Sequence, residues 1–154
     1  MKGKMIALTI MIVLLSVLLV QPAAAQSATW NAQYFSNGTL SGTPVVTRSE
    51  SAVSFNWGAG SPSSGVPNDG FSARFATDVV FPAGTYRFFL LADDEARVTI
   101  NFQPIPLINT LGQGRAGQTV SADVQLAGAT HIQIDYVELS GDAYLYLSWN
   151  NLAS

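Results

Sequence analysis

The sequence predicts an all-β protein, an antiparallel β-sandwich or flattened barrel of about ten strands, preceded by a cleavable signal peptide. From Thr29 onward, short apolar or alternating segments are separated by clusters of Gly, Pro, Asn, Asp and Ser. This rhythm is typical of strands joined by turns. No window shows a helical period, and 154 residues provide enough chain for one domain with one hydrophobic core.

The first 25 residues have the order of a secretory signal peptide. Lys2 and Lys4 precede an apolar segment from Met5 to Val20, and small residues follow up to Ala25. We therefore expect residues 1–25 to be removed, leaving residues 26–154 as the mature β domain. The sixteen residues from Met5 to Val20 fall short of the ~20 that span a bilayer, although an uncleaved anchor is the alternative. An extracellular, periplasmic or cell-surface location follows, with a mature domain that does not span the membrane.

Alternation of polar and apolar residues defines the expected strands. It is clearest in residues 131–137 and 143–149, where successive side chains suit opposite faces of a sheet. Residues 58–70 are rich in Gly, Pro and Ser, and we expect a long irregular loop there. The expected strands are Trp30–Phe35, Val45–Arg48, Ser54–Trp57, Phe71–Val80, Gly84–Ala92, Ala96–Asn101, Pro104–Asn109, Thr119–Gln125, Ala129–Val137 and Tyr144–Asn150.

Charge and cysteine content exclude several classes of function. Residues 26–154 contain five arginines and ten acidic residues, so their net charge is negative and a polyanion such as nucleic acid would be repelled. The absence of cysteine excludes thiolate metal sites, a cysteine nucleophile and disulfides.

No constellation of residues predicts catalysis, so we expect the protein not to be an enzyme. The single histidine, His131, opens a strand and has no motif around it. Asp135 and Glu138 have the residue types of a glycosidase pair. By alternation, however, these two side chains point to opposite faces of the sheet.

Three adjacent acids, Asp93, Asp94 and Glu95, form the one concentrated chemical feature. Carboxylates this close repel one another unless a cation or hydrogen-bond donors offset them, so the cluster is a candidate site for a hard cation. The competing interpretation is structural, in which Asp93 and Asp94 cap a tight turn and pair with backbone donors or with Arg97. We expect Arg74 and Arg97 each to pair with a carboxylate.

The order of features along residues 30–149 resembles the PA14 domain family, a β-sandwich module of bacterial toxins, glycosidases, adhesins and yeast flocculins. Single blocks are weak evidence, but five blocks in the right order are strong evidence for the fold and weaker evidence for any one activity. The blocks are Trp30–Pro44, Phe55–Gly58 with Phe71–Phe75, Gly84–Phe88, Ala92–Ile100 and Tyr136–Trp149.

The resemblance implies a metal and ligand site at Asp93 and Asp94. In PA14 lectins the matching pair is joined by a cis peptide and holds a calcium ion that coordinates sugar hydroxyls. This chain departs from that pattern, because Glu95 replaces a usual glycine and the asparagine of a later loop has no clear counterpart. The short connection between Glu138 and Ala143 offers Asp142 as a further candidate ligand.

The sequence therefore predicts a secreted or cell-surface binding module, with carbohydrate as the ligand class and calcium as the candidate cofactor. Its partner would be a glycan or another component of the cell envelope. Tyr144 and Tyr146 share one face of a strand and suit either sugar stacking or packing within a sheet. The alternative function is a structural or assembly protein of the envelope, which would act through protein contacts and self-association.

Overall fold

A computed structural model describes residues 28–152, which form eight strands and no helix. The predicted signal peptide, residues 1–25, lies outside the described residues. Since the described part of the chain is entirely strands and connections, no helix in it has the length and hydropathy of a membrane span. The strands are β1 (Trp30–Phe35), β2 (Val46–Glu50), β3 (Ser54–Gly58), β4 (Ser72–Asp93), β5 (Glu95–Ile100), β6 (Ile108–Asn109), β7 (Val120–Val137) and β8 (Ala143–Asn151).

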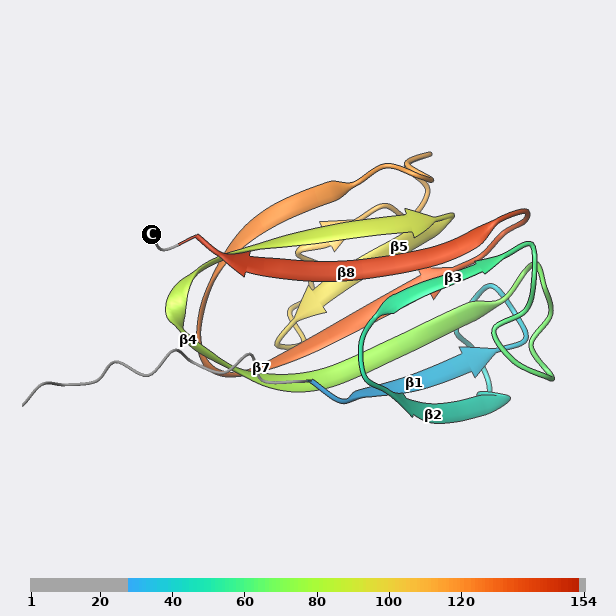
Figure 1. The fold of residues 1–154 in the computed structure, drawn as a ribbon, viewed down its shortest axis with the longest axis horizontal. Coiled ribbons are helices and arrows are strands. Elements are labelled where there is room, and N and C mark those ends of the chain that lie inside the picture. The colour runs from blue at the N-terminus through green and yellow to red at the C-terminus, as the bar shows by residue number, and fades with distance from the viewer. Residues whose placement is uncertain (1–27, 153–154) are drawn as a thin grey trace, which may run out of the picture.

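The two longest strands, β4 and β7, organise the whole domain. They pair antiparallel from Ser72 opposite Val137 to Leu90 opposite Val120, with one register shift between Phe81 and Gly84. Extra residues on one strand of a pair bend that strand and increase its twist. The pair curls at this shift, and its two halves lie in different layers of the molecule (Figure 1).

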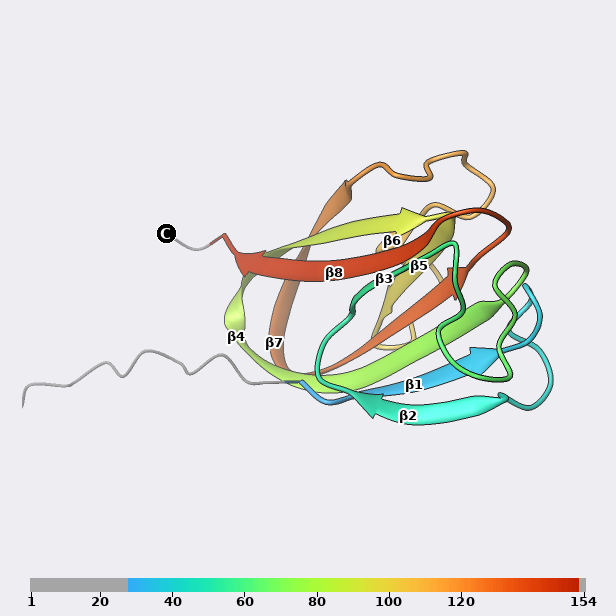
Figure 2. The ribbon, with the colours of Figure 1, turned by 45° about the vertical axis from the view of Figure 1, so that its right-hand side comes forward.

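Each layer is built on one half of this curled pair. The first layer has the order β2, β1, β4, β7, β5, β6, and it uses the N-terminal half of β4 with the C-terminal half of β7. The second layer adds β8 to the C-terminal half of β4, and β3 to β8. Figure 2 shows the layers facing each other. The predicted antiparallel β-sandwich is confirmed.

Aromatic side chains fill the space between the layers. The Trp57 ring, from β3 in the second layer, contacts the rings of Tyr34, Phe71 and Tyr136 at centroid distances of 6.3, 5.8 and 5.7 Å. Near the bend, the ring of Trp149 lies 5.7 Å from that of Phe81. Large buried rings contribute most of the apolar area that drives folding, so these contacts hold the two layers together.

The expected ten strands become eight because two apparent boundaries fall inside continuous strands. Pro82, Gly84 and Gly128 suggested turns, but they occupy the bend, where glycine and proline accommodate a bulge without ending the pairing. The expected segment Pro104–Asn109 contributes only the short strand β6, because its prolines cannot donate hydrogen bonds to a neighbouring strand. The long loop predicted over residues 58–70 is confirmed between β3 and β4.

One buried carboxylate ties the outer surface of the first layer together. Asp135 on β7 is 1% exposed and accepts hydrogen bonds from the Arg74 Nε at 2.6 Å and from the Arg97 guanidinium at 2.6 and 2.9 Å. These three residues occupy neighbouring positions on β4, β7 and β5. The expectation that both arginines pair with a carboxylate is confirmed, and they share the same one.

We predict that Asp135→Ala lowers the free energy of unfolding by about 2 kcal/mol, because two arginines lose a buried partner while remaining partly solvated. Urea denaturation measures the change. Asp123→Ala is the matched control, since the Arg87–Asp123 pair is exposed and screened by solvent, so its loss should change the free energy of unfolding much less. Equal effects of the two substitutions would contradict the assignment.

Candidate ligand-binding site

Asp93 and Asp94 lie where the chain crosses from one layer to the other. Asp93 ends β4 and pairs with Tyr144 of the second layer, whereas Glu95 begins β5 and pairs with Val137 of the first. Asp94 is therefore the only residue between the two strands, and the Asp93–Asp94 peptide bond is cis. Both side chains are partly exposed at the rim of the sandwich.

The Asp94 carboxylate organises the neighbouring connection between β7 and β8. Its Oδ2 atom accepts hydrogen bonds from the backbone amides of Leu139 and Ser140 at 2.7 and 3.1 Å. The next amide, of Gly141, donates to Oδ1 of Asp69 at 2.9 Å. Residues far apart in the sequence thus meet at this rim, where the β7–β8 connection is held between two aspartates.

Negative charge at the rim is not neutralised by a basic side chain. Burial and the charge of Asp94 raise the pKa of Asp93, and the charge of Asp142 adds to the increase, while a hydrogen bond from Tyr144 opposes it. None of the ion pairs formed within residues 28–152 includes Asp93, Asp94 or Asp142. The charges of Asp94 and Asp142 contribute to the raised pKa of Asp93, and a cation placed between these carboxylates would reduce their repulsion.

Tyr136 and Glu138 form a buried polar layer beneath the aspartates. The Tyr136 hydroxyl hydrogen-bonds to the Asp93 carbonyl oxygen and lies 2.8 Å from Glu138 Oε2. A hydroxyl has one proton, so it cannot donate to both oxygens at once. An ionised Glu138 accepts a hydrogen bond from the Tyr136 hydroxyl, whereas a protonated Glu138 can donate from Oε2 to the Tyr136 oxygen and leave the hydroxyl proton for the Asp93 carbonyl.

The surroundings of Glu138 favour that protonated form. Its side chain is fully buried, and Oε1 has no hydrogen-bond partner. Burial raises the pKa of Glu138 to about 7, a direction that the charges of Asp94 and Asp93 reinforce and the Tyr136 hydroxyl opposes. Glu138 therefore supports the site from below as a largely neutral group at mildly acidic pH.

Glu95 stands where the PA14 domains that the sequence resembles usually have glycine, and its side chain points to the β6–β7 connection. Its Oε1 atom accepts a hydrogen bond from the Gly112 amide at 2.8 Å, which anchors the connection between β6 and β7. The same connection approaches the site again at Gly117, whose amide donates to the Ala92 carbonyl at 2.9 Å. A Cβ at Gly117 would lie 3.0 Å from the Tyr144 hydroxyl, so glycine leaves that hydroxyl its space.

The structure brings together the residues predicted for the metal and ligand site. Asp142 is exposed, and its charge acts on Asp93. The structural interpretation holds for one atom, because Asp94 Oδ2 is satisfied by backbone amides, whereas Arg97 binds Asp135 instead. Within residues 28–152, no group of three or more His, Cys, Asp or Glu is arranged to hold a metal ion by itself.

Sequence reasoning missed the contributions of Asp69 and Tyr144 to this rim. Asp69 lies in the irregular loop, where no periodicity indicates its partner, and only its bond to Gly141 reveals its place. His131 lies elsewhere, on the outer face of the first layer, where it pairs with Asp78 at 2.9 Å and stacks on Phe102.

Comparison with known proteins identifies the family. The PA14 domain model matches residues 26–153, so the chain belongs to the PA14 domain family, and the predicted resemblance is confirmed. No match to a curated protein was found by sequence.

Solved structures with the same fold include an anti-sigma factor domain-containing protein from Clostridium clariflavum, at 22% identity and a TM-score of 0.70, which matches 82% of this chain and 42% of that one. The PA14 sugar-binding domain from RTX adhesin has 14% identity and a TM-score of 0.59, over 83% and 92% of the two chains. The Epithelial Adhesin 9 A domain from Candida glabrata, in complex with Galb1-3GlcNAc, has 10% identity and a TM-score of 0.62, over 83% and 84%.

These similarities differ in how much of the other protein they cover. The chain spans less than half the length of the anti-sigma factor domain-containing proteins that it matches. It spans most of the length of the adhesin domains. At these identities the likeness establishes the fold that the two groups share.

We predict that the stability of the domain in chelator falls between about pH 4.5 and pH 7. Glu138 has a higher pKa folded than unfolded, so the folded state keeps the proton that the unfolded state releases, and the stability present at low pH is lost as pH rises through this window. A pKa shift from 4.5 to about 7 corresponds to roughly 3 kcal/mol. Urea titrations across the window measure the loss, which Glu138→Gln should largely flatten; parallel slopes in the two proteins would contradict the assignment.

Proposed function

We propose that this protein is an extracellular carbohydrate-binding module in which Asp93 and Asp94 hold a calcium ion that contacts hydroxyl groups of the sugar. The observation that carries the proposal is the unneutralised pair of aspartates at the rim, where the pKa of Asp93 is raised by burial and by the neighbouring acids. Adhesin domains of the same fold support the ligand class, since one is described as sugar-binding and another is in complex with Galb1-3GlcNAc.

The donor set at the rim fits calcium as part of a coordination shell. Calcium is a hard cation that takes six to eight oxygen ligands, and carboxylates are its usual protein ligands. Asp93 and Asp94 would hold the ion, with Asp142 as a further candidate from the β7–β8 connection. These carboxylates supply only part of a shell of six to eight oxygens, so water or sugar hydroxyls would supply the rest. A bound calcium ion would supply a positive charge that orients hydroxyl oxygens.

The protein's own groups would define the shape of the site. Amides of Leu139 and Ser140 hold the Asp94 carboxylate in place, and Tyr136 fixes the backbone of Asp93 from below. These hydrogen bonds are made by the protein's own groups, so they would hold the site in shape and reduce the conformational freedom lost on binding. The exposed β7–β8 connection lies beside the aspartates and would contact the sugar.

We predict that Asp93→Asn/Asp94→Asn lowers calcium affinity at least tenfold, since two anionic ligands become neutral while the side-chain shape is kept. Calorimetry of residues 26–154 with calcium chloride measures this loss. Asp78→Asn is the matched control, because Asp78 is an exposed strand aspartate that pairs with His131 in the first layer. Calcium binding that survives the double substitution would refute the assignment of the metal ligands.

A glycan array, probed with and without chelator, tests the ligand class. We expect binding of at least one glycan that is lost both in chelator and in Asp93→Asn/Asp94→Asn. Glycan binding unaffected by chelator would retain the carbohydrate function and remove the calcium. Absence of glycan binding under both conditions would overturn the proposal.

The alternative of an envelope assembly protein has one supporting observation. Phe102 and Ile105, on the connection between β5 and β6, are 74% and 81% exposed, and exposed apolar groups of this size favour contact with another protein. Both residues lie on this one connection, and they are the only observation that supports the assembly function. The carbohydrate-binding proposal at Asp93 and Asp94 is therefore the stronger of the two.

A further inference from the structure

The solvent-facing side of the second layer carries apolar side chains where alternation calls for polar ones. On β4 the outward positions that precede Asp93 are Phe89 and Leu91, and both are partly exposed. Leu91 lies opposite Tyr146, and Asp93 lies opposite Tyr144, on the neighbouring strand β8. One row of outward side chains therefore leads from the aspartates along the strands to an apolar area.

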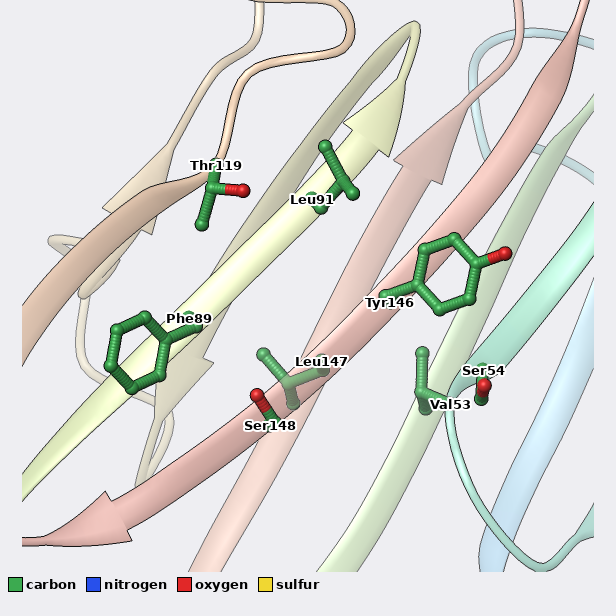
Figure 3. Close-up of a pocket in the computed structure, with 8 residues that line it drawn as sticks. All are labelled: Val53, Ser54, Phe89, Leu91, Thr119, Tyr146, Leu147 and Ser148. Carbon is green, nitrogen blue, oxygen red and sulfur yellow. The ribbon is translucent and has the colours of Figure 1, made fainter.

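This apolar area is hollowed into a groove of about 330 Å³. Its residues come from β4, β8, the start of β3 and the end of the β6–β7 connection. Figure 3 shows Phe89 and Leu91 on one side of Tyr146, with Val53 and Ser54 on the other and Thr119 facing β4. The lining consists of Val53, Ser54, Phe89, Leu91, Thr119, Tyr146, Leu147 and Ser148.

The chemistry of the groove matches a sugar ring. Aromatic and aliphatic groups form its surface, hydroxyl groups of Ser54, Thr119, Tyr146 and Ser148 surround them, and none of the lining residues is charged. A pyranose has the complementary arrangement, with apolar C–H faces and hydroxyl groups around the ring. The volume of the groove suits a small ligand. A stable protein interface instead needs an area of ~800 Å² from each partner.

The groove is continuous with the rim site. Tyr144 and Tyr146 have ring centroids 6.2 Å apart, and the Tyr144 hydroxyl hydrogen-bonds to Asp93. Two residues along a strand cover about 7 Å, a length of the order of one sugar unit with its linkage. The β6–β7 connection borders both places, with Gly117 beside Tyr144 and Thr119 at the groove.

We propose that the module binds a pyranose oligosaccharide along the outer face of β4 and β8, with one sugar at Asp93 and Asp94 and a following ring stacked in the groove on Tyr146. This inference rests on the proposed function and extends it from a single sugar to a chain. The groove contributes the apolar contact, and the rim contributes the polar one.

The test compares three monosaccharides with chains of the same sugars. Calorimetry with calcium present uses methyl β-glucoside, methyl β-galactoside and methyl β-mannoside against the β-1,4-linked tetrasaccharides of glucose, galactose and mannose. We expect at least one tetrasaccharide to bind about tenfold more tightly than its monosaccharide. Tyr146→Ala should reduce that ratio to about two or less, while Tyr146→Phe, which keeps the ring, should preserve most of it.

A second variant and a control guard against misfolding. Thr119→Phe fills the groove from an exposed position and removes no existing contact in the core, so it should also abolish the gain. Phe102→Ala removes an exposed aromatic ring from the first layer and should leave the ratio unchanged. Urea denaturation verifies that each variant is folded.

The outcomes separate this inference from the function beneath it. A monosaccharide that binds with no gain for its chain, or a gain that survives both Tyr146→Ala and Thr119→Phe, would overturn the groove alone. Failure of every monosaccharide and tetrasaccharide would overturn this inference, whereas the glycan array decides the carbohydrate function itself.

Discussion

The antiparallel pairing of β4 with β7 is the constraint on which the other parts of this domain depend. A single curled pair provides the centre of both layers, so every other strand attaches, directly or through one neighbour, to one of its halves. The bend at Phe81–Gly84 sets the angle between the layers, and the aromatic rings of Trp57 and Trp149 fill the space that this angle leaves. The same pairing decides where β4 ends, and therefore where the two aspartates stand.

The rim combines groups that each lower the stability of the folded state. Carboxylates without a basic partner repel one another, and a buried acid with an unpaired oxygen loses solvation. Here amides of Leu139 and Ser140 compensate Asp94, and burial raises the pKa of Glu138 to about 7, so that Glu138 is largely protonated at mildly acidic pH. What remains is a local excess of negative charge held in a defined geometry. An arrangement of this kind is typical of binding sites, because stability alone would favour neutral or paired side chains.

Alternation and turn residues sufficed to predict the all-β class, the first strand and the irregular loop, since these features depend on residues that are close together in the sequence. The continuity of β4 through Pro82 and Gly84 was not predictable, because those residues end most strands and only the long-range partner β7 shows that pairing resumes. The aspartate pair was identified from its composition and its family resemblance. The position of Asp69 at the rim and the apolar groove could not be predicted, because both depend on contacts between segments that are distant in the sequence. No local sequence pattern indicates such contacts.

The partner positions on β4 and β7 are far apart along the chain, with Ser72 opposite Val137, and this has a kinetic consequence. A fold dominated by such non-local contacts has a high contact order, and the entropy of closing large loops must be overcome before those contacts form. Only late in synthesis, once β7 has emerged, can either layer assemble around its centre. The nascent polypeptide therefore remains without its sandwich for most of its elongation.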